Sequence, residues 1–190
     1  LIMRRRLNNE GQTAALVTPD RGLARRVAAE LSRWGIEVDD SAGVPLAQTP
    51  PGAFLRLTAR MASEDLAPVP LLAALKHPLA SGGMQTVAFR TRVRDLELAV
   101  LRGPRPAAGL ESLKEALGKK LDEFEDILIP LEKAVYPFME LLEGTHPLRD
   151  LLKAHVAMAE HLSATDEETG PAKLWAGEAG ENAAGFVAEL

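Results

Sequence analysis

The hydrophobic pattern of residues 13–52 combines strand, turn and helix signals in unbroken order. The apolar run Ala14–Thr18 is short and ends at Pro19, which is typical of a strand buried on both faces of a parallel sheet. Gly35 suits the residue after a helix end, and Ile36–Val38 resembles a second short strand. Between the two predicted strands, apolar residues recur at helical spacing, at Leu23, Val27, Leu31 and Trp34. The pattern predicts a right-handed, parallel strand–helix–strand unit.

The turn before this predicted helix is the most informative local feature. Thr18 is predicted as the N-cap, Pro19 suits the first helical position, and Asp20 places negative charge at the positive end of the helix dipole. Free N–H groups at such a turn can bind a phosphate. Thr18, Arg21 and Arg25 are therefore candidate nucleic-acid contacts. The alternative is that Thr18 and Asp20 only cap the helix.

Helices are predicted over most of the remaining chain. Residues 1–9 resemble the last turns of a helix, and a chain that opens on Leu rather than Met suggests a piece of a longer polypeptide. Thr49 is predicted to cap a helix that continues through Met61. A short buried helix, Leu71–Leu75, should end before Pro78, and Ser81–Gly83 should form a flexible joint.

A longer, basic helix is predicted after this joint. Its apolar stripe runs from Val87 to Leu101, and the arginines outside the stripe include three more candidate nucleic-acid contacts, Arg90, Arg92 and Arg94. From Leu110 the pattern predicts a long acidic helix that Pro130 and Pro137 should kink or divide. Another helix should begin near Leu148, and the last should hold Leu174, Trp175, Phe186 and Val187.

The two halves of the chain carry opposite charge. Residues 1–106 hold 15 Lys/Arg and 10 Asp/Glu, a net charge of +5, whereas residues 107–190 hold 7 and 17, a net charge of −10. A phosphate backbone would favour the first half. The alternative is that ordinary solvated helix faces happen to differ in sign.

The sequence contains no motif for the common catalytic sites. Phosphate loops, dinucleotide-binding glycine patterns and zinc-protease or serine-hydrolase signatures are absent, and there is no cysteine. The four histidines are scattered, which favours structural roles. We therefore expect no catalytic residue, no metal and no cofactor in this chain. Without a membrane-length apolar run or a secretory signal, a cytoplasmic location is expected.

Several stretches resemble the AddB subunit of the alphaproteobacterial helicase–nuclease that repairs double-strand breaks. The principal ones are TAALVTPDRGLARRVAAELSRWGIEVDDSAGVPLAQTPPGAFLRL and LLAALKHPLASGG, supported by RVRDLELAVLRGPRP, LRDLLKAHVAMAEHL and KLWAGEAGE. A strand–turn–helix, a second strand and a helix ending in KHPL are also similar to the second RecA-like lobe of UvrD and RecB helicases.

The resemblance implies an α/β, mostly helical fold: a partial RecA-like unit at residues 1–83 and a helical subdomain at 84–190, acidic from about 107. It implies an internal, non-catalytic segment that contributes DNA contact and subunit packing during DNA-end processing. It also implies an AddA-type partner subunit, double-stranded DNA ends, and ATP with Mg²⁺ and an iron–sulfur cluster only in the parent complex. The alternative function is a purely structural, protein-interaction module without DNA contact.

Overall fold

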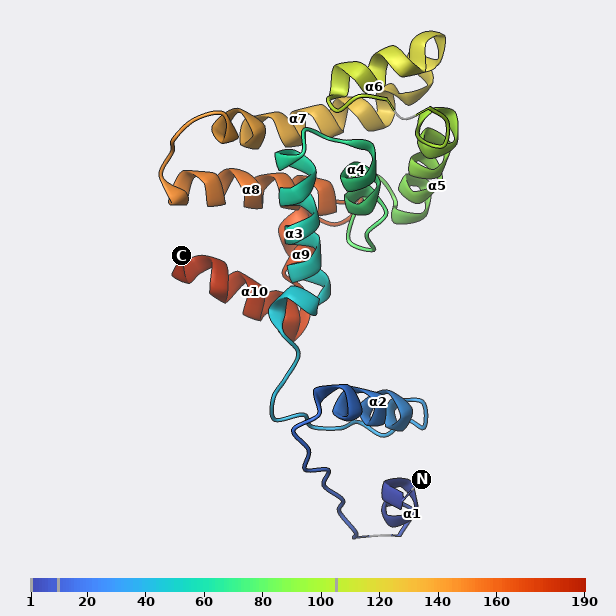
Figure 1. The fold of residues 1–190 in the computed structure, drawn as a ribbon, viewed down its shortest axis with the longest axis vertical. Helices are drawn as coiled ribbons and strands as arrows, with labels where there is room; N and C mark the ends of the chain where they lie inside the picture. Colours follow the sequence, from blue (N-terminus) through green and yellow to red (C-terminus); the bar gives the residue numbers. More distant parts are fainter. Residues whose placement is uncertain (1, 10, 105) are drawn as a thin grey trace. The chain divides into compact units, whose positions relative to one another are not determined.

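The computed structural model describes residues 2–9, 11–104 and 106–190, and every regular element in them is helical (Figure 1). The chain divides into two compact units, residues 1–43 and 44–190, which are described separately below. The functional division expected between residues 83 and 84 stays a prediction.

The first unit consists of α1 (Ile2–Leu7), α2 (Arg21–Ser32) and the segments that flank them. Gly35 follows α2 with φ of +69°, and the Ile36 N–H closes the helix end on the Leu31 carbonyl at 3.1 Å. The predicted helix and its glycine stop are thus confirmed. Among the described residues of this unit, Leu31 is the one buried hydrophobic side chain.

The predicted strands at Ala14–Thr18 and Ile36–Val38 do not form, so the α/β expectation is wrong and the described residues have an all-helical fold. A strand exists only when its backbone pairs with a neighbour, and a two-stranded sheet leaves both edges unpaired. Here the apolar run is not even buried, because Val17 is 96% exposed. An apolar pattern alone could not reveal that the described part of the chain offers no neighbouring strand.

The second unit is a stack of helices around one core. Its elements are η1 (Leu46–Gln48), α3 (Pro50–Ser63), α4 (Pro68–Leu75), α5 (Thr86–Leu96), the π-helical turn η2 (Glu97–Leu101), α6 (Leu110–Leu117), the 3-10 segment η3 (Gly118–Phe124), α7 (Glu125–Leu142), α8 (Leu148–Ser163), α9 (Gly170–Leu174) and α10 (Gly177–Glu189). The largest fully buried side chains come from six of these helices: Phe54, Met61, Leu71, Phe89, Leu96, Leu128, Met158 and Leu174. The prediction that regular structure after Pro50 is helical is confirmed for the described residues.

Thr49 caps α3 as predicted, with its hydroxyl oxygen accepting the Gly52 N–H at 3.4 Å. Two other boundaries differ from the prediction. The acidic helix breaks at Gly118, whose φ is +52°, while Pro130 and Pro137 lie inside α7. Both prolines are exposed and seven residues apart, so the carbonyls that they leave unpaired lie on the solvent side of the helix.

The last predicted helix is also divided, because Gly177 adopts φ of +66° and separates α9 from α10.

The expected flexible joint at Ser81–Gly83 is instead held against the end of α8. The N–H groups of Ser81 and Gly82 donate to the Leu162 carbonyl at 2.8 and 3.0 Å, and the Gly83 N–H donates to the Ala164 carbonyl at 2.8 Å. These bonds satisfy carbonyls that a helix C-terminus leaves without partners. The segment that leads into α5 is therefore fixed by α8.

Two glycines of α10 provide a test of this packing. A Cβ at Gly180 would overlap the backbone of Trp175, whereas a Cβ at Gly185 would meet open space. We expect Gly180→Ala to lower the free energy of unfolding by about 1–3 kcal/mol through overpacking. Gly185→Ala should raise it by up to about 1 kcal/mol, because alanine favours a helix over glycine. Urea denaturation followed by circular dichroism measures both, and equal effects would contradict the close approach.

Candidate functional site

The helix α2 is capped by Asp20, two residues later than the sequence indicated. The Asp20 carboxylate accepts the N–H groups of Gly22 and Leu23 at 2.8 and 3.1 Å, and the Thr18 hydroxyl accepts the N–H of Asp20 at 3.1 Å. The predicted N-cap at Thr18 is thus wrong, because the longer reach of the carboxylate satisfies two helix N–H groups at once. The backbone N–H groups of Gly22 and Leu23, which could have bound a phosphate, therefore already donate to the Asp20 carboxylate.

Arg21, the first residue of α2, is engaged within its own unit. Its guanidinium donates to both carboxylate oxygens of Asp40, at 3.0 and 2.8 Å, and to the Gly43 carbonyl at 3.0 Å. The hydrogen bonds from Arg21 lower the pKa of Asp40. Arg25 lies one helical turn further on and is exposed. The contacts predicted for Thr18, Arg21 and Arg25 stay predictions, but two of these side chains already have partners.

The basic helix α5 presents its three candidate arginines in two directions. Phe89, Val93 and Leu96 form the buried face of α5. Positions four apart on a helix share a face, whereas positions two apart point away from each other. Arg90 and Arg94 therefore lie together, and Arg92 lies on another side of the helix.

Arg92 joins α5 to the start of α7. Its guanidinium donates to both carboxylate oxygens of Asp126, at 2.8 and 2.7 Å, and to the Glu123 carbonyl. It also stands over the Phe124 ring, with its central carbon 4.9 Å from the ring centroid. Hydrogen bonding to Asp126 raises the pKa of Arg92 and lowers that of Asp126. Arg92 thus stabilises helix packing.

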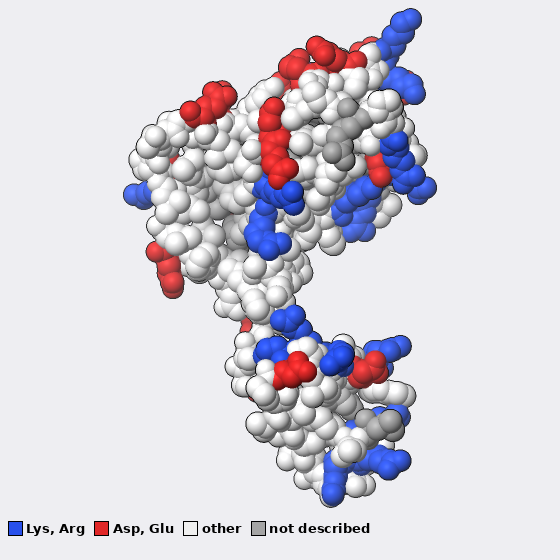
Figure 2. Space-filling view, viewed as in Figure 1, with Lys and Arg blue, Asp and Glu red and all other residues white. Residues whose placement is uncertain are grey.

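Arg90 and Arg94 have no such partners. Both side chains are exposed, and within the described residues no carboxylate lies within 4.0 Å of either guanidinium. Val87 and Leu98 lie on the same side of the helix and are 65% and 53% exposed. In the view of Figure 2, Lys and Arg side chains gather where Figure 1 draws α5, and Asp and Glu side chains line the edge where it draws α6 and α7.

Lys173 adds a third cation beside this face. Its ammonium group donates to Ser81 Oγ at 2.6 Å and to Thr86 Oγ1 at 3.3 Å, and the two hydroxyls lie 2.9 Å apart. Desolvation lowers the pKa of Lys173, Glu168 raises it, and nearby Arg90 lowers it further. Sequence reasoning missed this cluster, because Ser81 and Lys173 are 92 residues apart.

A serine beside a lysine can act as nucleophile and base in hydrolases, but this pair lacks the required geometry. Ser81 is fully buried, so a substrate could not reach its hydroxyl. The N–H groups of Ser81 and Gly82, which could stabilise an oxyanion, already donate to Leu162. The cluster instead fixes α9 to the start of α5.

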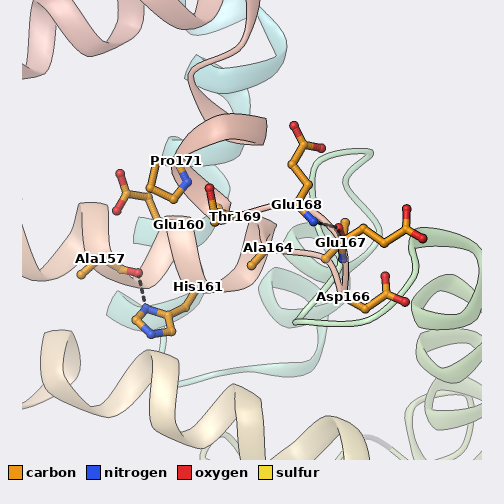
Figure 3. Close-up of a pocket in the computed structure, with 11 residues that line it drawn as sticks. Ala157, Glu160, His161, Ala164, Asp166, Glu167, Glu168, Thr169 and Pro171 are labelled. Carbon is orange, nitrogen blue, oxygen red and sulfur yellow. Dashed lines mark hydrogen bonds between the residues drawn. The ribbon is translucent and has the colours of Figure 1, made fainter.

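A hollow of about 440 Å³ lies where α8 ends and α9 begins (Figure 3). Glu160, Glu167 and Glu168 line it, but their carboxylates point in different directions. Glu160 accepts the Trp175 indole N–H at 2.7 Å, and His161 is bonded to the Ala157 carbonyl at 2.8 Å. In the part of the chain that the structure describes, no group of three or more potential ligands could hold a metal ion.

His155 is the most buried of the histidines whose pKa is shifted. Its Nε2 lies 3.0 Å from the Thr58 hydroxyl and 3.1 Å from the Leu55 carbonyl, so this nitrogen carries the proton that the carbonyl accepts. The ring stacks on Phe138, with centroids 5.1 Å apart. Desolvation lowers the pKa of His155 below 6.5, and the Leu55 carbonyl partly opposes this shift.

No protein-family model, curated protein or solved structure matches this chain. None of the helices among the described residues is both long and apolar enough to cross a membrane.

The buried imidazole predicts a pH dependence of stability. Because folding lowers the pKa of His155, the native state binds fewer protons than the unfolded chain between the two pKa values. The stabilisation is complete above the unfolded pKa of about 6.5 and is lost as the pH falls through the folded value. As the pH falls from neutral to about 5, the free energy of unfolding should decrease more steeply for wild type than for His155→Gln, by at most about 1.4 kcal/mol per pH unit. Urea denaturation at each pH measures this difference.

Desolvation also lowers the pKa of His77, so His77→Gln should likewise make the free energy of unfolding less dependent on pH. Parallel curves for wild type and His155→Gln would contradict the buried neutral imidazole.

Proposed function

We propose that this chain is a non-catalytic segment of a DNA-end-processing helicase–nuclease subunit, and that it touches the DNA backbone through α5. The single observation that carries the DNA contact is the pair Arg90 and Arg94, exposed on one helix face without carboxylate partners among the described residues. Both side chains are free to neutralise phosphates. The sequence resemblance to AddB supports the parent complex and an AddA-type partner subunit.

The charges around α5 support this choice over the turn before α2. Arg21 already binds a carboxylate with two hydrogen bonds, so moving it to a phosphate would break an existing ion pair. Arg90 and Arg94 could bind a phosphate without breaking an ion pair of this kind. Lys173 places a further positive charge beside Arg90. Arginine and lysine side chains are among the usual donors to phosphate oxygens.

Such contacts position a duplex without reading its sequence. The acidic helices α6 and α7 would repel phosphate and so restrict DNA to the α5 side of this unit. We therefore propose a weak, sequence-independent contact that becomes effective inside a larger complex. Duplex ends are its expected substrate class.

Salt dependence tests the proposal directly. We expect the full chain to bind a fluorescein-labelled duplex with an affinity that falls between about 50 and 200 mM salt. Arg90→Ala with Arg94→Ala should reduce the slope of log affinity against log salt by about two, because each phosphate contact contributes about 0.9. Affinity at the lowest salt should fall at least about tenfold. Fluorescence anisotropy measures both quantities.

A matched control removes the same charge elsewhere. Arg149 and Lys153 are also exposed and four residues apart, on α8, so Arg149→Ala with Lys153→Ala should leave the slope nearly unchanged. Arg21→Ala with Arg25→Ala tests the turn before α2. Equal losses in the α5 and α8 variants would reduce the contact to general charge attraction and leave a purely structural module as the better account.

A further inference from the structure

A largely apolar groove lies between α3, α8 and α10. It measures about 460 Å³ and its aliphatic and aromatic walls come from Leu46, Leu55, Leu152, Val156, Phe186 and Leu190. Phe186 is 51% exposed and Leu190 is 56% exposed at its edge. Figure 1 shows α3 crossing between α8 and α10, and α3 contacts both. A second hollow shares Leu152 and Val156 and extends the apolar surface along α8.

The polar groups of the groove are few and mostly satisfied. His155 lines it, but Nε2 of this ring already bonds to Thr58 and Leu55. A small polar ligand would need several convergent polar groups to fix its orientation, and the walls do not offer them. An apolar groove that continues into a second hollow along α8 instead suits the apolar face of an amphipathic helix, which presents side chains at spacings of three and four residues.

The charges around the groove select the kind of helix. Arg56 on α3 lines the groove, and Arg149 and Lys153 on α8 line the adjoining hollow. All three are exposed and form no ion pair in the part of the chain described by the structure. Glu160 lines the adjoining hollow and accepts the Trp175 indole N–H, so three cations and one carboxylate border the two hollows. The rim therefore attracts negative charge.

We propose that this groove docks an acidic amphipathic helix of a partner protein, with apolar side chains in the groove and carboxylates on Arg56, Arg149 and Lys153. The site lies on α3, α8 and α10, apart from the arginines of α5, and does not depend on DNA contact. Apolar burial would supply most of the affinity, and the rim charges would set the choice of partner.

A displayed library of helical peptides tests both parts of the proposal. Its members carry Leu or Phe at positions i, i+3, i+4 and i+7, with Glu, Lys, Gln or Ser at random elsewhere. Selection on the full chain should enrich Glu at the polar positions. Selection on Arg149→Glu with Lys153→Glu should enrich Lys instead, because the rim charge is reversed.

Binding of one enriched acidic peptide then separates the groove from the rest of the surface. Phe186→Ala should weaken it at least about tenfold, because truncating an aromatic anchor at an interface commonly costs that much. The side chain is half exposed, so the variant keeps its fold. Arg90→Ala with Arg94→Ala should leave peptide binding unchanged while it weakens DNA binding, which keeps failure of the two proposals distinguishable.

Three outcomes would overturn the docking proposal. The library would yield no enriched helix, the charge-reversed chain would select the same acidic peptides, or Phe186→Ala would bind the peptide as tightly as wild type. Sedimentation adds a fourth: a dimer of the wild-type chain that Phe186→Ala dissociates would assign the groove to a second copy of this chain.

Discussion

The arrangement of the second unit depends on how Ser81, Gly82 and Gly83 attach to the C-terminal end of α8. Three consecutive N–H groups donate to the Leu162 and Ala164 carbonyls, so one bend of the chain closes a helix end that lies about 80 residues later. The Ser81 hydroxyl oxygen also accepts a hydrogen bond from the ammonium group of Lys173 on α9. Helices α5, α8 and α9 therefore meet at one hydrogen-bonded point, and the direction of α5 is set there.

The arginines of this protein divide according to their partners rather than their positions in sequence. Arg21 and Arg92 each bind a carboxylate with two hydrogen bonds, an arrangement that only the planar guanidinium allows. Both serve the fold. Arg90 and Arg94 lie on the same helix as Arg92 but face away from α7, and their exposed charges can interact with other molecules. A two-residue offset on one helix separates structural from surface cations.

Much of the helical structure could be predicted from periodicity and caps. Thr49 before a proline pair placed α3 correctly, and Gly35 ended α2 where its positive φ was needed. The strand at Ala14–Thr18 could not be judged in this way, because its existence depends on neighbours that a local pattern does not encode. Pro130 and Pro137 do not divide α7 for a related reason: a proline on the solvent side of a helix is tolerated when water can bond the freed carbonyl.

The candidate site was only partly accessible from the sequence. Local charge identified α5 as basic, yet it could not show that Asp126 neutralises Arg92 or that Lys173 approaches Arg90. Those pairings join residues 34 and 83 positions apart, and only the packing of helices brings them together. The groove of α3, α8 and α10 is likewise built from three distant segments, so a search for motifs would not reveal it.

The small number of buried side chains among residues 2–9 and 11–43 bears on how the protein unfolds. One buried leucine contributes roughly 1.5–3 kcal/mol, whereas ordering a single backbone residue costs about 1–2 kcal/mol. Hydrogen bonds such as those of Asp20 and Arg21 stabilise local turns but cannot offset that entropy over the whole segment. We therefore expect residues 44–190 to unfold cooperatively around their core, and α1 and α2 to open at a lower free energy.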